Sequence, residues 1–381
     1  MTSGAALTAG QLNRATLARQ LLLNREPVPV GAAVRRVVAL QAQEPASPYL
    51  ALWNRVTDFA AADLDAAFAG AEVVKATLMR ITLHAVHVAD YPVFHNALLR
   101  VLRGPRLGHA RFTDSGLSIS DADELAVHLL AFAAAGARTK ADIEAMFEER
   151  LGHRHRGVWW ALRCFAPLVQ VPTGGPWSFG TRPVFRTYAD PLPVAHGEDS
   201  TRRLVRRYLD GFGPASIADI AQFTLLTRTA ARDAVRALGD DLVVRTGPDG
   251  ADLYDVPGAP LPPARTPAPP RLLPMWDSTL LAYADRGRMI PPEYRTLVTR
   301  INGDVLPTLL VDGHVAGVWR PLGNGIEATA FRPLSARAWK GLATEAAALV
   351  EFLADRDPSV YRRYGHWWAK LPPGSEVRTL G

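Results

Sequence analysis

Cysteine, lysine and long apolar runs are nearly missing from this sequence, and two of these absences exclude a class of protein. Cys164 is the one cysteine among 381 residues, which rules out an intrachain disulfide and a multi-cysteine zinc site. No run reaches the roughly 18 apolar residues of a transmembrane helix. The first residues also lack the basic and then apolar pattern of a signal peptide, so we expect a cytoplasmic protein.

Sequence motifs of the commonest enzyme classes are absent as well. There is no G-x-x-x-x-G-K-[ST] loop, no G-x-G-x-x-G after a strand, no H-E-x-x-H and no G-x-S-x-G. His84 and His87 are three residues apart in an expected strand, so they point to opposite faces and make a poor metal pair. We therefore predict no metal and no cofactor. Most nucleotide-, metal- and serine-dependent enzymes are removed from consideration.

The charge balance favours a polyanionic partner. The net charge is +6 with a pI of about 9.7, and arginine supplies nearly all of the positive charge. The planar fork of arginine suits phosphate groups. Arginine is also frequent in proteins from GC-rich genomes, which the Ala, Arg and Pro richness suggests here. The basic balance therefore supports nucleic-acid binding without establishing it.

The stretch QAQE at residues 41–44 is the most informative local feature. Valines at residues 34–38 recur at the spacing of one helix face, so we predict a helix over residues 30–41 with the first glutamine on its apolar stripe. Pro45 disfavours helix before it and places the second glutamine just past the helix end. Two neutral amides can together hold a water molecule. Alternatively, both glutamines are solvated or satisfy helix carbonyls.

Capping and periodicity predict the elements around this stretch. Thr8 and Gln11 form a capping box that opens a first helix running to about residue 23. The other elements expected in this segment are a helix over residues 49–56, a short helix over residues 63–68 and two paired strands over residues 73–88 that break near residue 79.

Two later segments resemble each other at an offset of 216 − 139 = 77 residues. Thr139 with Asp142, and Ser216 with Asp219, each form a hydroxyl and acid pair that opens a helix. Each is followed by a turn, a second helix and a β-rich stretch around a Gly/Pro turn, which is the order of a winged helix. The N-terminal segment has the same order of helices and then strands. We therefore predict three tandem winged-helix units.

A proline-rich stretch at residues 257–274 predicts a surface linker before a C-terminal domain of different character. That domain has a hairpin signal around DGH at residues 312–314, a strand over residues 326–331 and a helix over residues 335–353. The predicted fold class is α+β. The predicted domains are residues 1–116, 117–196, 197–262 and 263–381.

Basic side chains fall at positions that suit contact with DNA. Arg228, Arg232 and Arg236 form one stripe on the helix in the recognition position of the third unit, where they suit phosphate contacts. Arg154 and Arg156 precede two tryptophans that offer surfaces for base stacking. Further candidates are Arg80, Arg286 and Arg288. The alternative for the stripe is a solvated helix face.

The stretch LQAQEP at residues 40–45, followed by SPY and LW, resembles the signature of the AlkZ-type winged-helix DNA glycosylases. LMRITLH at residues 78–84 and LPMWD at residues 273–277 are similar to further family segments. So are DRGR at residues 285–288 and GVWR at residues 317–320, and the resemblance therefore runs through most of the chain. The first stretch is the most specific because it carries the paired-glutamine motif.

The resemblance implies three winged helices and a C-terminal β-barrel, arranged as a C-shaped monomer around duplex DNA. It implies removal of N7-alkylated guanine by Gln41 and Gln43, as in the branch by which actinomycetes resist their own DNA-alkylating antibiotics. His84 would contact the water or the wall of the site. Glu44 would contact the same wall or water, or assist as a base; the alternative, which we prefer, is a salt bridge or solvent exposure. No lysine is evident beside the motif, so we expect a monofunctional enzyme without strand cleavage.

A rival hypothesis is a non-enzymatic winged-helix regulator or drug-binding protein. The tandem repeat and the basic balance fit it equally well. The two glutamines and the non-duplicated C-terminal domain favour the enzyme. On either hypothesis we expect a soluble monomer with no membrane and no obligate protein partner.

Overall fold

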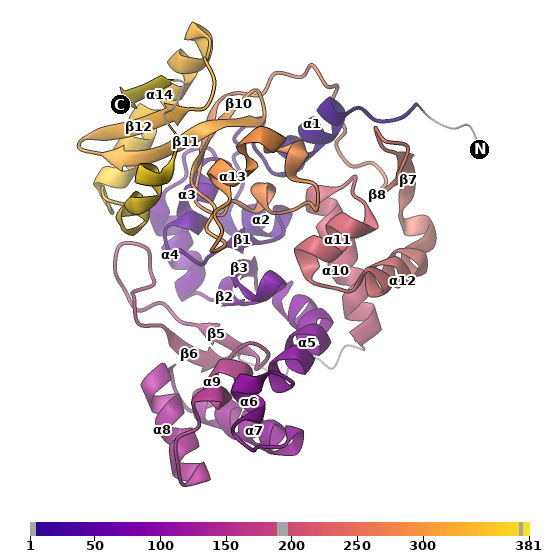
Figure 1. The fold of residues 1–381 in the computed structure, drawn as a ribbon, viewed down its shortest axis with the longest axis vertical. Helices are drawn as coiled ribbons and strands as arrows, with labels where there is room; N and C mark the ends of the chain where they lie inside the picture. Colours follow the sequence, from indigo (N-terminus) through magenta and orange to yellow (C-terminus); the bar gives the residue numbers. More distant parts are fainter. Residues whose placement is uncertain (1–4, 189–196, 373–375) are drawn as a thin grey trace.

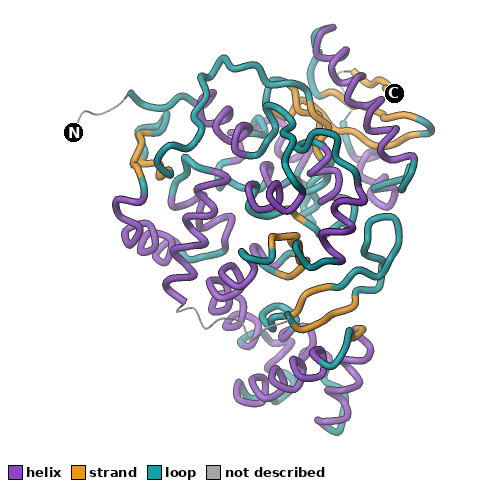
Figure 2. The backbone as a smooth tube through the Cα atoms, turned by 180° about the vertical axis from the view of Figure 1, so that it is seen from behind, coloured by secondary structure: helices purple, strands orange, loops and turns teal. Residues whose placement is uncertain are grey.

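The computed structural model describes residues 5–188, 197–372 and 376–381 and shows an α+β protein (Figure 1). Figures 1 and 2 view the molecule from opposite sides and place the C-terminal sheet at one end of the long axis, with a helical lobe at the other. None of the helices in the described ranges is long and apolar enough to cross a membrane. The predicted boundary at residue 196 lies outside these ranges.

The N-terminal segment contains the helices and paired strands of the first predicted unit. Its elements are α1 (Ala9–Arg19), α2 (Val30–Arg36), β1 (Leu40–Gln41), α3 (Ser47–Trp53), α4 (Ala61–Ala69), β2 (Val73–Thr77), the 3-10 helix η1 (Met79–Ile81) and β3 (Leu83–His87). Thr8 and Gln11 form the predicted capping box. Strands β2 and β3 pair as predicted, with η1 at the predicted break.

Helix α2 ends earlier than predicted, and this changes where the two glutamines lie. It stops at Arg36, and Val38 then adopts a left-handed backbone (φ 75°) that a right-handed helix cannot continue through. The chain enters strand β1, where Gln41 pairs with His84 of β3. The prediction of a helix to residue 41 is therefore wrong, and the motif begins on the edge strand of a sheet.

The second segment shares a sheet with the first. Its elements are α5 (Tyr91–Leu107), α6 (Ala110–Thr113), α7 (Ile119–Ala134), β4 (Arg138–Thr139), α8 (Lys140–Leu151), α9 (Arg156–Leu162), β5 (Leu168–Gln170) and β6 (Val184–Thr187). Lys75 of β2 pairs with Gln170 of β5, which makes one six-stranded sheet in the order β1-β3-β2-β5-β6-β4.

The third segment has three helices, the last two of them around a turn, and then a hairpin. Its elements are α10 (Gly197–Phe212), α11 (Ile217–Thr224), α12 (Arg228–Leu238), η2 (Gly239–Asp241), β7 (Val243–Thr246) and β8 (Asp252–Asp255). The capping boxes at Thr139 and Ser216 are both formed, as predicted. The order of elements agrees with the expected winged helix, and that assignment stays a prediction.

The C-terminal segment begins with strand β9, which the linker prediction missed. Residues 257–270 have no helix or strand, as predicted, but Arg271–Leu273 form β9 and pair with β10. The remaining elements are η3 (Ser278–Leu280), η4 (Arg286–Arg288), η5 (Pro292–Tyr294), α13 (Arg295–Val298), β10 (Thr308–Val311), β11 (His314–Leu322), β12 (Gly325–Ala330), α14 (Ala336–Ala354), η6 (Arg362–Lys370) and β13 (Glu376–Leu380). Asp312 and Gly313 both have positive φ in the predicted hairpin turn.

The C-terminal sheet is open. Its order is β13-β12-β11-β10-β9, and among the described residues no pairing joins β9 to β13. Helix α14 packs against β9, β12 and β13, so a helix covers the sheet in place of closure of the sheet on itself. The β-barrel implied by the resemblance is therefore not found, whereas the α+β class is confirmed.

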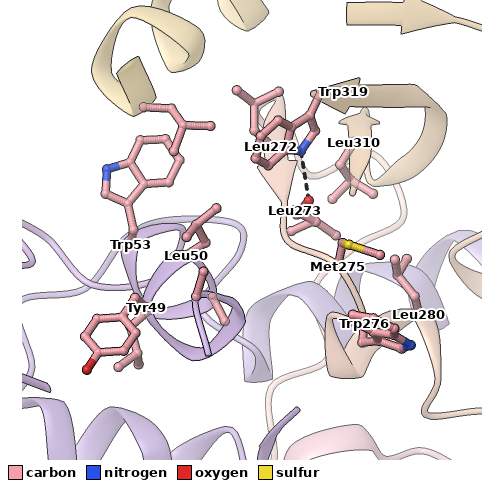
Figure 3. Close-up of a cluster of buried hydrophobic side chains, with 14 of the residues drawn as sticks. Tyr49, Leu50, Trp53, Leu272, Leu273, Met275, Trp276, Leu280, Leu310 and Trp319 are labelled. Atoms are coloured by element: carbon pink, nitrogen blue, oxygen red, sulfur yellow. Dashed lines mark hydrogen bonds between the residues drawn. The ribbon is translucent and has the colours of Figure 1, made fainter. Parts of the chain in front are cut away.

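One buried core joins the N-terminal segment to the C-terminal sheet. Figure 3 shows Tyr49, Leu50 and Trp53 of α3 in one cluster with side chains of β9, β10 and β11, and all of these residues belong to that core. The Nε1 of Trp319 donates a hydrogen bond of 2.9 Å to the carbonyl oxygen of Leu273 within it. The two segments therefore fold against each other although most of the chain separates them.

Buried polar contacts strengthen this junction next to the motif. The Arg55 guanidinium donates two hydrogen bonds of 2.8 Å to Asp277, and both side chains are at most 1% exposed. Burial acts to raise the pKa of Asp277, but Arg55 and the hydrogen bonds from Thr279 together hold that pKa below its usual range. The hydroxyl of Ser278 donates to the carbonyl oxygen of Ala39 at 2.8 Å, so this loop braces the residue just before β1.

Candidate active site

Gln41 is a buried amide with both of its functional atoms engaged. It lies on β1 and is 4% exposed. Its Nε2 donates to the hydroxyl of Thr82 at 3.1 Å, and that hydroxyl donates to the carbonyl oxygen of Met79 at 3.1 Å. Because the Thr82 proton is used by Met79, the Thr82 oxygen presents lone pairs to Gln41. The amide orientation is therefore set by a two-step hydrogen-bond chain.

Gln43 follows two residues later and is exposed. It lies at a bend just past the end of β1. The backbone N–H of Gln43 donates to Oε1 of Gln41 at 3.1 Å. The N–H of Leu83 approaches the Gln43 side-chain oxygen at 3.5 Å, a weak contact. The Nε2 of Gln43 makes no hydrogen bond within the described residues. Because Gln43 is also exposed, its side-chain amide is accessible to a ligand.

His84 forms the buried partner of this pair across the sheet. Its Nδ1 lies 3.1 Å from the Thr82 carbonyl oxygen and its Nε2 lies 3.3 Å from the Arg80 guanidinium. Burial, and then the Arg80 charge, lower the pKa of His84 to about 3. The imidazole is therefore neutral at physiological pH, with the proton on Nδ1 and a lone pair facing Arg80. His84 here accepts and donates fixed hydrogen bonds.

Arg80, which contacts His84, lies in a segment with an unusual backbone conformation. Arg80 and Ile81 both have positive φ (55° and 57°), a conformation that non-glycine residues adopt at a cost. The guanidinium lies 4.8 Å from the Phe223 ring of α11 and donates to the Phe223 carbonyl oxygen at 3.4 Å. Burial and then the neighbouring Arg286 lower the pKa of Arg80 to about 10. Arg80 thus connects the motif to the third segment.

Glu44 is paired, as the alternative in the sequence analysis had it. Its carboxylate forms a salt bridge with Arg363 and accepts a hydrogen bond of 3.0 Å from the Tyr364 hydroxyl. Both partners lie on η6, in the C-terminal segment. A carboxylate with two donors is a poor candidate for a free general base. Sequence reasoning could not find these partners, because more than 300 residues separate them from the motif.

Lys75 is a charged residue near the motif that sequence reasoning missed. It is buried on β2, its ammonium lies 4.3 Å from the Phe179 ring, and it interacts electrostatically with Glu44. Burial lowers the pKa of Lys75 to about 8, against the opposing effect of Glu44. Lys75 pairs with Ala85, the neighbour of His84, so it points to the opposite sheet face from the Gln41 amide. The sequence signal that could have identified Lys75 is a lysine inside a strand rich in β-branched residues.

The remaining arginine candidates fall into two groups. Arg286 and Arg288 lie on η4: the first donates to the Thr299 hydroxyl at 2.8 Å, and the second lies 3.9 Å from the Tyr283 ring. The other candidates are exposed residues of α12 and of the region at the start of α9, namely Arg154, Arg156, Arg228, Arg232 and Arg236. Figure 1 shows α9 and α12 well apart from β1 and β3, so the structure does not bring these arginines to the glutamines.

The site offers neutral amides, a neutral imidazole and positive charge. Within the three described ranges, no group of three or more His, Cys, Asp or Glu side chains could hold a metal ion. The arrangement can orient a water molecule beside the exposed amide of Gln43 and can favour an anionic ligand near Arg80 and Arg286. These capabilities suit hydrolysis of a bond whose leaving group needs no strong acid.

Comparison with known proteins also indicates a DNA glycosylase family. A family model described as DNA glycosylase AlkZ-like matches residues 34–352. The interstrand DNA cross-link repair glycosylase of Streptomyces sahachiroi is 26% identical over 206 residues, which make up 52% of this chain and 55% of that protein. The chain thus matches about half the length of that relative. The solved structure of Streptomyces sahachiroi DNA glycosylase AlkZ has a TM-score of 0.79 at 20% identity and covers 93% of this chain and 99% of its own, which shows a shared fold.

Proposed function

This chain belongs to the DNA glycosylase AlkZ-like family, and we propose that it hydrolyses the N-glycosidic bond of an alkylated base in duplex DNA. The observation that carries the proposal is the contact between the two glutamines: Gln41 is buried and oriented, its Oε1 accepts the backbone N–H of Gln43, and the Gln43 side chain is exposed. Family membership agrees with the resemblance found in the sequence. The curated relative acts on interstrand cross-links, which supports a bulky or cross-linked substrate here as well.

The chemistry that we propose starts from guanine alkylated at N7. Such a base carries a positive charge and leaves as a neutral molecule when the glycosidic electron pair returns to it, so no strong general acid is needed. The deoxyribose develops oxocarbenium character, and a water oxygen forms the new bond to the anomeric carbon. Gln43 would accept a hydrogen bond from that water, and Gln41 would hold Gln43 through its Oε1. The released proton goes to solvent.

Electrostatic fit supports the same roles. Amide oxygens fixed before the reaction can stabilise developing positive charge on the sugar without reorganising. His84, neutral and hydrogen-bonded to Thr82 and Arg80, would form the wall of the site. We propose no covalent intermediate, because Lys75 lies on the other face of the sheet and is buried. The product would be an abasic site in an uncut strand.

We further propose that the three N-terminal segments are winged-helix units that grip duplex DNA, with boundaries at residues 116, 196 and 262. The exposed arginines of α12 and those near α9 would contact phosphates at a distance from the lesion, and Arg80, Arg286 and Arg288 would add positive potential close to it. The biological role that we propose is resistance to a DNA-alkylating natural product, carried out by a monomer.

The direct test is base release from a duplex that carries a bulky N7-alkylguanine, measured by chromatography, with abasic sites revealed by alkali. The variants are Gln41→Ala/Gln43→Ala and, as a matched control, Gln222→Ala, which removes an exposed amide on α11. We expect excision by the wild type and the control, little or none by the double variant, and similar DNA binding by all three. Strand breaks should appear only after alkali.

Full excision by the double variant would remove the glutamines from the mechanism. No excision by the wild type on methyl, bulky and cross-linked adducts, together with tight sequence-specific binding to undamaged DNA, would establish the regulator hypothesis instead.

A further inference from the structure

Glu44 of the motif binds to a segment that lies outside the residues matched by the family model. Glu44 follows Gln43 directly, and its two partners, Arg363 and Tyr364, lie on η6 beyond the matched residues 34–352. Arg363 donates to the Tyr364 hydroxyl at 2.6 Å, and that hydroxyl donates to Glu44 at 3.0 Å. The three side chains therefore form a closed hydrogen-bonded triangle, which we call the Glu44 clamp.

Tyr364 makes the clamp rigid. Its buried ring meets Trp276 edge to face at 5.5 Å, and Nε1 of Trp276 donates to the Gly303 carbonyl oxygen at 3.0 Å. Burial, and then the Glu44 charge, raise the pKa of Tyr364 above its ordinary value, so the hydroxyl stays protonated and remains a donor. The carboxylate thus binds to a fixed point of the C-terminal segment.

Glu44 connects the clamp to the turn at residues 43–47, which leads from Gln43 into α3. Its side chain is 16% exposed, whereas that of Arg363 is 65% exposed. The Glu44 carbonyl oxygen accepts the N–H of Ser47 at 3.0 Å where the chain turns into α3. Gln43 is therefore anchored on both sides: its own N–H is bound to Gln41, and the next residue is bound to the clamp.

We propose that Arg363 and Tyr364 are positioning residues for the reaction, which they serve by holding Glu44 and so fixing the exposed Gln43 amide beside the water. This proposal rests on the proposed function of the two glutamines. The Arg363 side chain is 65% exposed, so solvent weakens its ion pair with Glu44 and the pair contributes little to stability. The clamp therefore affects the rate of the chemical step much more than it affects folding. It also assigns Glu44 a role other than general base.

The test compares Arg363→Gln, Tyr364→Phe and Glu44→Gln with the control Arg362→Gln. Arg362 is the exposed neighbour of Arg363, and its loss removes the same charge without touching Glu44. Single-turnover excision is measured with saturating enzyme on the adduct duplex, beside the dissociation constant and the urea unfolding midpoint. We expect Arg363→Gln and Tyr364→Phe to slow excision roughly 10- to 100-fold, as small misplacement of a reacting group does. Arg362→Gln should match the wild type.

Two further results distinguish positioning from simple loss of structure. The double variant Glu44→Gln/Arg363→Gln should be no slower than the slower single variant, because both changes open the same contact. Arg363→Lys, which keeps the charge, should recover part of the rate. Binding and the unfolding midpoint should stay close to the wild type throughout.

The proposal is overturned if Arg363→Gln and Arg362→Gln excise at the same rate, or if weaker binding or lower stability accounts for the whole loss. This failure is separable from failure of the proposed function. In the first case Gln41→Ala/Gln43→Ala is still inactive, whereas in the second case it still excises the base.

Discussion

The backbone N–H of Gln43 donates a hydrogen bond of 3.1 Å to the side-chain oxygen of Gln41. The two glutamines are therefore coupled: the buried amide supports the backbone of the exposed one. Thr82 completes the arrangement by accepting from the other end of the Gln41 amide. Any change to this chain of contacts should alter the position of Gln43, although Gln43 is exposed and Gln41 is buried.

The first prediction concerns Thr82→Val, which has nearly the same shape but cannot accept a hydrogen bond. The buried Nε2 of Gln41 would lose its partner, which costs about 1–3 kcal/mol. Rotation of the amide to find another partner would remove the acceptor for Gln43, and we expect single-turnover excision to fall at least about tenfold. Thr82→Ser keeps the hydroxyl and should stay within a few-fold of the wild type. Equal rates for both variants would contradict the coupling.

The second prediction concerns pH and His84. Its pKa is lowered to about 3 in the folded protein, against an ordinary value of 6.5. Between these values the unfolded chain binds a proton that the folded protein refuses, so stability falls as the pH falls from 6.5 towards 3. The contribution of one such group reaches about 1.4 kcal/mol per pH unit.

Urea unfolding at pH 7, 6, 5 and 4 should therefore show a shallower acid loss for His84→Gln than for the wild type. The control is His87→Gln, because His87 is only partly buried and lies at the end of the same strand. Parallel curves for His84→Gln and the wild type would show that folding does not lower the pKa of His84.

The third prediction concerns the ion pair at the junction of the two terminal segments. Asp277→Asn would leave the Arg55 charge buried without its partner and should lower the free energy of unfolding by about 3–5 kcal/mol. Arg55→Met/Asp277→Leu removes both charges and should cost less than the sum of the single changes.

The matched control for that experiment is Asp233→Asn, which breaks a pair with Arg236 that has side chains 58% and 73% exposed. We expect it to change stability by no more than about 1 kcal/mol. Similar losses for Asp277→Asn and Asp233→Asn in urea unfolding would show that the buried pair does not hold the junction.

The fourth prediction concerns the basic stripe of α12. If Arg232 contacts a phosphate, Arg232→Gln should weaken binding to any duplex and lower the slope of log K against log salt by about 0.9. The excision rate at saturation should not change, because α12 lies apart from the glutamines. Arg337→Gln on α14 removes another exposed charge and should leave the slope unchanged. Equal slopes for both variants would place α12 outside the DNA-binding surface.

Local chemistry explains which parts of the fold the sequence predicted. The capping boxes at Thr8, Thr139 and Ser216 are formed as expected, since their hydroxyl and acid or amide partners lie within one turn. The turn at Asp312 is likewise determined by residues that accept positive φ. The α+β class and the family followed from such patterns and from the motif itself.

Contacts between distant residues decided the rest. The periodicity of the sequence predicted a helix as far as Gln41, but Gln41 pairs with His84 on β3 and is part of a strand. The C-terminal sheet is open and α14 packs against it, so the expected barrel is not found among the described residues. The sequence by itself determined the pair of amides and the elements around them, since those depend on neighbours a few residues away. Only the tertiary structure decided that Glu44 is bound by Arg363, because no local pattern links side chains that far apart in the chain.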